Sequence, residues 1–257
     1  HPNDPNYIIE GNDGGMAISR DRAKSWQFIE NLPLAQFYHI NVDNEIPYYV
    51  YGGMQDNGSW RGPAYVWRRG GSRNYYWEEL SFGDGFDVVP VPDDARFGYS
   101  MSQGGNLVRY DYETGNTKYI KPMHPEGETL RFNWNAAIAQ DPFDSNTLYY
   151  GSQFVHKSSD RGENWMIMSP DLTTNDTSKQ KQLESGGLTY DVTQAENFTT
   201  ILSIAPSPVN ENVMWVGTDD GNLQLTQDGG ETWMNVSDRL PEFPENGWIP
   251  QIHPSTF

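Results

Sequence analysis

The octapeptide TQDGGETW, from Thr226 to Trp233, is the most informative stretch of this sequence, because its pattern occurs three times. The other copies are SRDRAKSW, from Ser19 to Trp26, and SSDRGENW, from Ser158 to Trp165. Each copy has Ser or Thr first, Asp third, Gly or Ala fifth, a small polar residue seventh and Trp last. No comparable octapeptide is visible between the first two copies, so that stretch must use a degenerate form.

Each octapeptide predicts a tight turn that ends in a buried aromatic anchor. Asp and Ser side chains bond nearby backbone amides, and glycine favours tight turns. The final Trp has a large apolar face to bury and one N–H group to satisfy. We therefore expect a structural role, and not a catalytic one, for the following residues of the three copies: Ser19, Asp21, Trp26, Ser158, Asp160, Gly162, Trp165, Thr226, Asp228, Gly230 and Trp233.

A second repeat runs from a Pro- and Asp-rich corner into an aromatic or aliphatic run that ends near glycine. Its copies are residues 1–11, 42–53, 91–102, 141–152 and 207–218. Steps of roughly 40 to 66 residues between copies are those expected for four-stranded β-propeller blades. Further apolar runs, which we interpret as innermost strands, are residues 37–42, 86–91, 134–140, 199–205 and 248–252. The runs after the corners are then second strands, and the octapeptides join third to fourth strands.

The predicted fold is an all-β propeller with about five blades' worth of four-stranded antiparallel sheets. The expected units are 1–36, 37–83, 84–130, 131–196 and 197–246, with 247–257 as a further innermost strand. Two arrangements fit this register. The chain is part of a larger ring, or residues 248–252 complete the first blade and close a five-bladed ring. The polar segment 173–187 is interpreted as an insertion with one short helix or an ordered loop.

Composition supports many short strands and excludes several functional classes. Aromatic residues at 14%, with 25 Gly and 17 Pro, suit short strands joined by tight turns. No apolar run reaches the length of about 18 residues that a membrane-spanning helix needs, so direct membrane insertion is not expected. A formal net charge of −18 argues against nucleic acid and anionic membranes as partners. Cysteine is absent, so no disulfide framework holds the fold together.

The octapeptides resemble the Asp-box, or bacterial-neuraminidase repeat, of sialidases, xyloglucanase-type glycosidases and sortilin-type receptors. Residues 51–63, 100–111, 149–165 and 216–233 extend the resemblance to sortilin-like repeat proteins, which are loosely labelled glycosyl hydrolases. The resemblance implies a secreted propeller in an extracellular, periplasmic or cell-surface location, and a fragment of a longer protein. It implies no established reaction. The Arg-Ile-Pro motif of sialidases is absent, and xyloglucanase-type enzymes place their catalytic aspartates between two propellers.

The loops after the second strands and before the innermost strands are expected to share one face, opposite the octapeptides. Binding residues concentrate on such loops. The ligand-binding candidates on this face are His39, Gln55, Trp60, Arg131, Trp134 and His156. The catalytic candidates are Asp56, Asp84, Asp87, Asp219 and Asp220, because glycoside hydrolysis needs two carboxyl groups beside the scissile bond.

No cofactor and no metal site is expected, because the histidines lack metal-ligand spacing. Calcium is the alternative that the acidic loops leave open. The function predicted is a binding scaffold for a glycan or a polypeptide. The alternatives are a xyloglucanase-like enzyme that uses a carboxylate pair, and a structural subunit of a cell-envelope assembly in which other blades or subunits cover open sheet edges.

Overall fold

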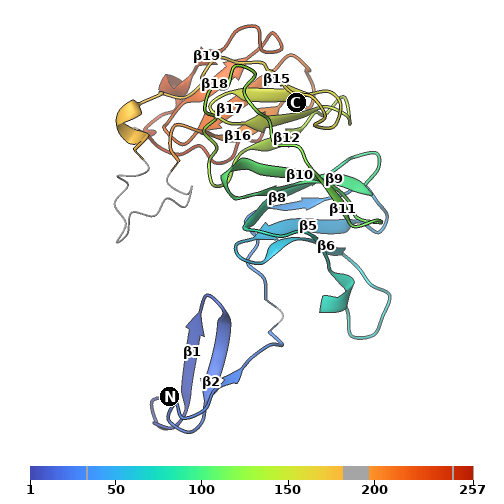
Figure 1. Cartoon of the computed structure of the whole chain (residues 1–257), viewed down its shortest axis with the longest axis vertical. Coiled ribbons are helices and arrows are strands. Elements are labelled where there is room, and N and C mark those ends of the chain that lie inside the picture. Colours follow the sequence, from blue (N-terminus) through green and yellow to red (C-terminus); the bar gives the residue numbers. More distant parts are fainter. Residues whose placement is uncertain (33, 182–196, 245, 257) are drawn as a thin grey trace. The chain divides into compact units, whose positions relative to one another are not determined.

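The computed structural model describes the chain apart from residues 33, 182–196, 245 and 257. It divides into two compact units, residues 1–36 and residues 37–257, and each unit is described by itself (Figure 1). Every sheet is antiparallel, and its strands follow one another in chain order. The expected all-β propeller architecture of four-stranded antiparallel blades is confirmed.

Unit one holds a three-stranded sheet made of β1 (Ile8–Asn12), β2 (Gly15–Ser19) and β3 (Gln27–Phe28). Ile9 lies opposite Ile18, and Ala17 lies opposite Phe28. The β1–β2 turn closes on Gly15, whose φ of 128° is readily available only to glycine. The first octapeptide connects β2 to β3.

Unit two holds four four-stranded sheets that follow one another in chain order (Figure 1). The first is β4 (Ile40–Val42), β5 (Tyr49–Met54), β6 (Gly58–Pro63) and β7 (Glu78–Ser81). The second is β8 (Gly85–Pro90), β9 (Phe97–Ser102), β10 (Asn106–Asp111) and β11 (Asn116–Tyr119). The third is β12 (Ile138–Gln140), β13 (Leu148–Gly151), β14 (Val155–Ser158) and β15 (Met166–Ile167). The fourth is β16 (Ile201–Pro206), β17 (Met214–Thr218), β18 (Leu223–Thr226) and β19 (Met234–Asn235).

Short 3-10 helices occur in the connections, and they are η1 (Asn74–Tyr76), η2 (Gln103–Gly105), η3 (Thr177–Lys179) and η5 (Ser237–Arg239). The helix η3 lies in the polar segment interpreted as an insertion, and residues 182–187 of that segment lie outside the described residues. Within residues 1–32, 34–181, 197–244 and 246–256, no helix is long and apolar enough to cross a membrane.

The positions of the strands along the sequence agree with the second repeat. Each predicted second strand contains or overlaps the observed one, and four of the five predicted innermost runs contain or overlap β4, β8, β12 and β16. The fifth run, residues 248–252, forms no strand. Ile249 donates its N–H to the Thr218 carbonyl at 3.0 Å and accepts from the Ser203 hydroxyl at 2.7 Å. Ile201 makes the same kind of crossing contact with the Ser152 carbonyl at 2.8 Å, but among the described residues no second strand pairs with residues 248–252.

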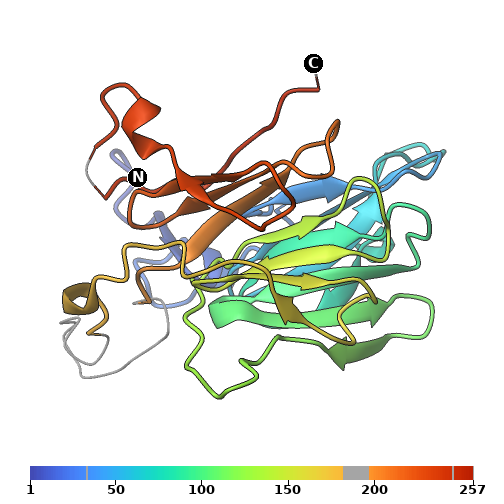
Figure 2. The ribbon, with the colours of Figure 1, turned by 90° about the horizontal axis from the view of Figure 1, so that it is seen from above.

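Hydrophobic cores lie between successive sheets of unit two, which overlap when seen from above (Figure 2). Between the first two sheets, Tyr51 packs with Val88 and Tyr110. The largest core contains Phe86, Tyr99 and Met101 of the second sheet together with Leu148 and Tyr150 of the third. A third core joins the last two sheets, and its residues include Tyr149, Val155, Ile201, Ile204 and Val216. Burial between sheets supplies the main hydrophobic stabilisation of this unit.

Glycines in three second strands permit close approach of the chain that follows. A Cβ atom on Gly53 would lie 2.3 Å from the Phe86 backbone nitrogen. On Gly151 it would lie 2.8 Å from Ile201 Cγ2, and on Gly217 it would lie 2.5 Å from Ile249 Cγ2. These distances are shorter than van der Waals contact, so only glycine allows the next innermost segment to cross here.

Candidate functional site

The octapeptides form one repeated set of hydrogen bonds. In the second copy, the Ser158 hydroxyl accepts from the Gly162 N–H at 2.8 Å and donates to Asp160 Oδ1 at 2.8 Å. Asp160 also accepts from the Asn164 N–H at 2.9 Å and from its side-chain amide at 2.7 Å. The same bonds recur around Asp21 and Asp228. Both carboxylate oxygens are therefore engaged in turn formation.

The octapeptide Trp residues of unit two attach each sheet to the preceding one. Trp165 Nε1 donates to the Ile120 carbonyl at 2.8 Å, and Trp233 Nε1 faces the Met168 carbonyl at 3.4 Å. Both rings pack against the cores between sheets. In unit one, Trp26 is 45% exposed. The contacts of unit two support the structural role that the sequence predicts.

In three sheets, a polar side chain just after the second strand accepts a hydrogen bond from a backbone N–H group. That N–H group lies in the segment that leads into the innermost strand of the same sheet. Gln103 Oε1 accepts from the Asp84 N–H at 2.8 Å, and Gln153 Oε1 accepts from the Arg131 N–H at 2.8 Å. Asp219 Oδ1 accepts from the Thr200 N–H at 2.9 Å. Asp219 thus occupies the position that glutamine holds in the other sheets, and this equivalence is visible in the repeat.

Three of the five candidate acids are held in structural contacts. Asp219 is fully buried, and its second oxygen accepts from the Thr200 hydroxyl at 2.5 Å and from Asn133 at 3.1 Å. Asp220 accepts from the Thr174 N–H and hydroxyl, both at 2.7 Å, and from the Thr218 hydroxyl at 2.6 Å. Asp84 is 8% exposed and accepts from the Asp56 N–H at 2.9 Å. Burial raises the pKa of Asp219 to about 6, against the opposing effect of its bonds to Thr200.

Asp56, the fourth candidate acid, lies at the tip of the β5–β6 turn with φ of 60°. Its backbone N–H is tied to Asp84, as described above. This conformation is tolerated by Asp better than by most other residues, so the turn accounts for its position.

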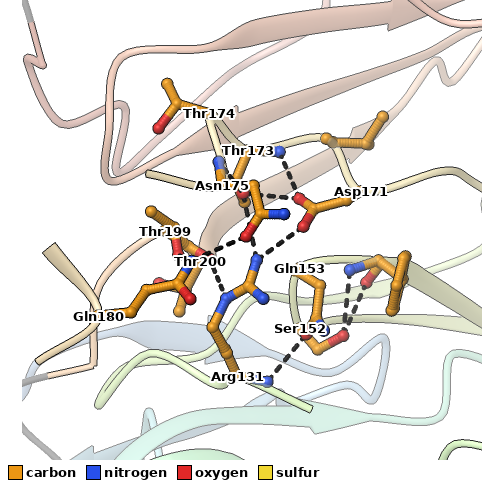
Figure 3. Close-up of polar contacts among 12 residues, drawn as sticks. Arg131, Ser152, Gln153, Asp171, Thr173, Thr174, Asn175, Gln180, Thr199 and Thr200 are labelled. Carbon is orange, nitrogen blue, oxygen red and sulfur yellow. Dashed lines mark hydrogen bonds and ion pairs between the residues drawn. The ribbon is translucent and has the colours of Figure 1, made fainter. Parts of the chain in front are cut away.

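Arg131 is committed to contacts within the protein (Figure 3). Its Nη2 forms an ion pair with Asp171 Oδ2 at 2.7 Å and lies 3.3 Å from the Thr173 hydroxyl. Its Nε donates to the Thr199 carbonyl at 3.1 Å, and its side chain is 13% exposed. Gln180 also bonds Thr199, at 2.8 Å. These contacts fasten the segment before β16, so Arg131 positions loops.

His156 lies in the core and not on the loop surface. It is 1% exposed, its Nε2 lies 2.8 Å from the Ser152 hydroxyl, and its ring packs near Phe132 and Trp165. Burial lowers the pKa of His156 to about 4, so the ring is neutral at physiological pH. A ligand cannot reach this ring without displacing the surrounding aromatic side chains.

Side chains from three sheets converge at the innermost strands of unit two. His39 precedes β4, Asp87 lies in β8, and Asn135 precedes β12. His39 Nε2 lies 2.7 Å from Asn135 Nδ2, and His39 Nδ1 lies 3.7 Å from Asp87 Oδ2. Asn41 Nδ2 lies 3.3 Å from Asp87 Oδ1 and donates to the Val88 carbonyl at 2.9 Å. We name His39, Asn41, Asp87 and Asn135 the axial cluster.

The axial cluster is partly open to solvent. The side chain of His39 is 35% exposed, and that of Asp87 is 19% exposed. Burial raises the pKa of Asp87, and the neighbouring His39 opposes this rise. The cluster thus combines an imidazole, a carboxyl group and two amides, and its imidazole and carboxyl group are partly exposed.

Tyr38 and Gln55 form a hydrogen-bonded pair, and Tyr38 directly precedes His39 of the axial cluster. Tyr38, next to His39, is 45% exposed, its hydroxyl donates to Gln55 Oε1 at 2.5 Å, and its ring stacks on Phe86 at 4.5 Å. Trp60 and Trp134 are half-buried on the same loop side. Trp60 Nε1 donates to the Asn57 carbonyl at 2.6 Å, and the Trp134 carbonyl accepts from Gly104 at 3.3 Å.

The structure therefore brings His39 and Asp87 together, and it links Gln55 to Tyr38, the residue before His39. Arg131, His156, Asp219 and Asp220 are engaged in contacts within the protein. Tyr38, Asn41 and Asn135 were missed as site residues, although Tyr38 and Asn135 lie in loops that the sequence assigns to this face. Across the described residues, no group of three or more His, Cys, Asp or Glu side chains is arranged to hold a metal ion.

Comparison with known proteins supports the fold. The structure of an ancestral GH74 enzyme is similar to this chain at 15% identity and a TM-score of 0.54, and the similarity covers 96% of this chain and 31% of the enzyme. The extracellular domain of a putative one-component system from B. thetaiotaomicron is similar at 14% identity and a TM-score of 0.51, and the similarity covers 95% of this chain and 28% of that protein. This chain thus spans less than a third of the length of either protein. No protein-family model and no curated protein matches the sequence.

Such low identity shows the fold alone, and the fold is that of β-propeller blades. The propeller class expected from the resemblance is confirmed. A closer relation to sortilin-like or Asp-box proteins stays a prediction.

Proposed function

We propose that this protein is a propeller binding scaffold whose axial cluster contacts a neutral glycan, with a polypeptide as the second ligand class. The observation that carries the proposal is the convergence of His39, Asp87 and Asn135 from three different sheets. Residues brought together from separate blades on a rigid scaffold form a preorganised surface. The exposed ring of Tyr38 adds an apolar face on which a sugar or a side chain can stack.

The charge of the protein favours a neutral ligand over an acidic one at this site. The chain carries a formal charge of −18, and Asp87 adds a carboxyl group to the cluster itself. An anionic ligand would meet an unfavourable field there. Amide and imidazole groups offer both donors and acceptors, which suits the hydroxyl groups of a sugar or the backbone of a peptide.

The polysaccharide-cleaving alternative has weaker support. Glycoside hydrolysis uses two carboxyl groups about 5 Å or about 6.5–9.5 Å apart. Asp87, with its raised pKa, resembles a general acid, but its contacts among the described residues are with His39 and Asn41. The oxygens of Asp219 and Asp220 are engaged by Thr, Asn and backbone donors. A scaffold that acts outside the cytoplasm is the expectation that the sequence resemblance adds.

A glycan panel tests the proposal. The purified chain is titrated with soluble neutral polysaccharides and oligosaccharides by calorimetry, while released reducing ends are measured in the same samples. We expect binding without release, and we expect His39→Ala and Asn135→Ala to weaken it by about tenfold, since each removes a polar contact in a preorganised site.

Exposed residues away from the cluster supply matched controls. His253→Ala and Asp93→Asn remove an imidazole and a carboxyl group, the groups that His39 and Asp87 contribute to the cluster, from exposed positions. Both variants should bind as tightly as the parent chain. Reducing-end release that Asp87→Asn abolishes and Asp93→Asn does not would replace the scaffold proposal with a hydrolase. Binding that survives His39→Ala and Asn135→Ala unchanged would remove the axial cluster from the site.

A further inference from the structure

The connection between β6 and β7, residues 64–77, is longer than the octapeptide turns and differs from the acidic chain around it in charge. The connections at the same end of the third and fourth sheets are the octapeptide turns, whereas this connection has its own 3-10 helix η1. It extends from the sheet that carries β6 (Figure 1). It contains three arginines and no acidic residue in a chain of formal charge −18. We name residues 64–77 the basic aromatic loop.

The aromatic side chains of this loop are exposed. Trp67 is 88% exposed, Tyr75 is 62% exposed and Tyr65 is 54% exposed. The rings of Tyr65 and Trp67 meet edge to face, with centroids 5.0 Å apart, and the rings of Tyr75 and Tyr76 lie 4.2 Å apart. Large exposed aromatic groups that lie together mark an interaction site more often than solitary ones do.

The three arginines of the loop are exposed, and one of them contacts a tyrosine. Arg68 Nη1 donates to the Tyr75 hydroxyl at 3.1 Å, and that hydroxyl donates to Tyr76 at 2.8 Å. In the part of the chain that the structure describes, no carboxylate forms an ion pair with Arg68, Arg69 or Arg73. By contrast, Arg61, at the base of the loop, pairs with Glu78 at 2.7 Å. The loop thus presents uncompensated positive charge.

The loop is ordered by its own contacts. Gly71 donates to the Arg68 carbonyl at 3.1 Å and closes a turn, with φ of 102° at Gly70 and 71° at Gly71. At the base, Trp77 lies so close over Gly62 that a Cβ atom there would be 2.3 Å from the indole. Phe37 stacks on Trp77 with ring centroids 6.0 Å apart. A surface held in one arrangement loses less conformational entropy when it binds.

We propose that the basic aromatic loop binds an acidic polysaccharide, one whose sugars carry carboxylate or sulfate groups. Arginine presents a planar fork of donors that matches the oxygens of carboxylate and sulfate. Exposed Trp and Tyr rings offer flat apolar faces on which sugar rings can stack. The combination of both groups in one ordered loop matches a ligand that is at once cyclic, polar and negatively charged. This surface is separate from the axial cluster, which favours neutral ligands.

The charge of the whole protein favours a polysaccharide over nucleic acid. Double-stranded DNA carries one charge per about 1.7 Å of its axis, so the field of a chain with charge −18 repels it strongly. An acidic polysaccharide carries its charges more sparsely, and screening over about 8 Å at physiological ionic strength limits the repulsion felt at an extended loop.

Affinity electrophoresis and calorimetry with defined polymers test this proposal. Polygalacturonate supplies carboxylate groups, heparin supplies sulfate groups, and dextran, double-stranded DNA and anionic phospholipid vesicles are the comparison ligands. We expect binding to at least one of the two acidic polysaccharides at low salt, weakening as salt is added, and weaker binding to the comparison ligands. Arg68→Gln, Arg69→Gln and Arg73→Gln together should reduce the affinity by about tenfold or more.

A second triple variant separates a specific loop from net charge. Arg20→Gln, Arg22→Gln and Lys24→Gln remove three positive charges from exposed positions of unit one. This control should change the affinity by about twofold at most, because it lowers the net charge by the same amount, leaves the loop intact and removes only exposed charges that salt screens. Trp67→Ala should weaken binding by about fivefold and leave the salt dependence unchanged, since it removes stacking and no charge.

Three results would overturn the proposal. One is equal loss of binding in the loop variant and in the control variant. Another is tighter binding to DNA or vesicles than to both acidic polysaccharides. The third is no binding to either acidic polysaccharide by a chain whose circular dichroism shows it to be folded. None of these results bears on the axial cluster, whose ligands are tested with neutral polymers.

Discussion

The octapeptides at residues 19–26 and 158–165 have the same turn but different surroundings. Asp21 and Asp160 each accept from the backbone N–H of the residue four positions on, at 2.9 Å in both copies. Trp165 is bonded to the Ile120 carbonyl and packs on a core, whereas Trp26 is 45% exposed. The turn therefore depends on local sequence, and the anchoring of the Trp depends on the preceding blade.

Truncation of the anchoring Trp should have the largest effect. Trp165→Ala removes an indole that packs between two sheets, and we expect it to lower the free energy of unfolding by about 3–5 kcal/mol. Trp26→Ala should cost only about 1 kcal/mol, because the ring is already partly exposed. Denaturant-induced unfolding of the two variants gives the comparison. Equal losses would show that both rings contribute through the local turn alone.

The fifth position of the octapeptide should give the next largest effect. Gly162 has φ of 83°, and a Cβ atom there would lie 2.5 Å from Ile120 Cδ1. Gly162→Ala should therefore cost about 2–4 kcal/mol, from the left-handed backbone and the clash together. Ala23 already has φ of 64°, so Ala23→Gly should stabilise unit one by up to about 1 kcal/mol. A shift of the melting temperature in the same direction for both variants would contradict this account.

The first position should respond alike in both copies. The Ser19 and Ser158 hydroxyls each accept a backbone N–H at 2.8 Å, and each serine is 1% exposed. Loss of the acceptor leaves a buried donor unsatisfied, so Ser19→Ala and Ser158→Ala should each cost about 1–2 kcal/mol. Unfolding curves that differ by more than a factor of two between these variants would show that the surroundings also govern the turn.

Acid pH should produce the smallest effect. Hydrogen bonds from Thr232 lower the pKa of Asp228 to about 2, and the corresponding bonds from Ser25 lower the pKa of Asp21. A depressed folded-state pKa adds stability that is present above about pH 4 and is lost as the pH falls through about 2. Asp228→Asn should therefore flatten the fall of the melting temperature between pH 4 and pH 2. An identical slope in the variant would remove Asp228 as a source of acid sensitivity.

Features that depend on residues close together in the chain could be predicted from the sequence, whereas features that depend on contacts between sheets could not. The octapeptide turns and the second strands follow from residues close together in the chain, such as Ser158, Asp160 and Gly162. The strand predicted at residues 248–252 is missing because an innermost strand forms by pairing with the second strand of its sheet, and in the part of the chain that the structure describes no second strand pairs with these residues. The structural role of Asp219 was missed, although its alignment with Gln103 and Gln153 at the ends of second strands reveals it.

The axial cluster lay beyond sequence analysis for a different reason. His39 and Asn135 meet although they are 96 residues apart, and no local pattern connects them. Their contact depends on how far each sheet is rotated from the one before it. That rotation is the sum of many packing contacts between sheets, such as those of Phe86 and Tyr150.

Gly53, Gly151 and Gly217 have a consequence for how such a chain can lengthen during evolution. Each glycine lies where the next innermost segment crosses, and a single methyl group there would push the two segments apart. The distance between each of these second strands and the segment that crosses it thus depends on a position that carries no side chain. A duplicate of the first, third or fourth sheet would keep its junction with the segment that follows only if the copy retained this glycine, whereas the second sheet, whose β9 ends in Met101 and Ser102, joins its neighbour without one.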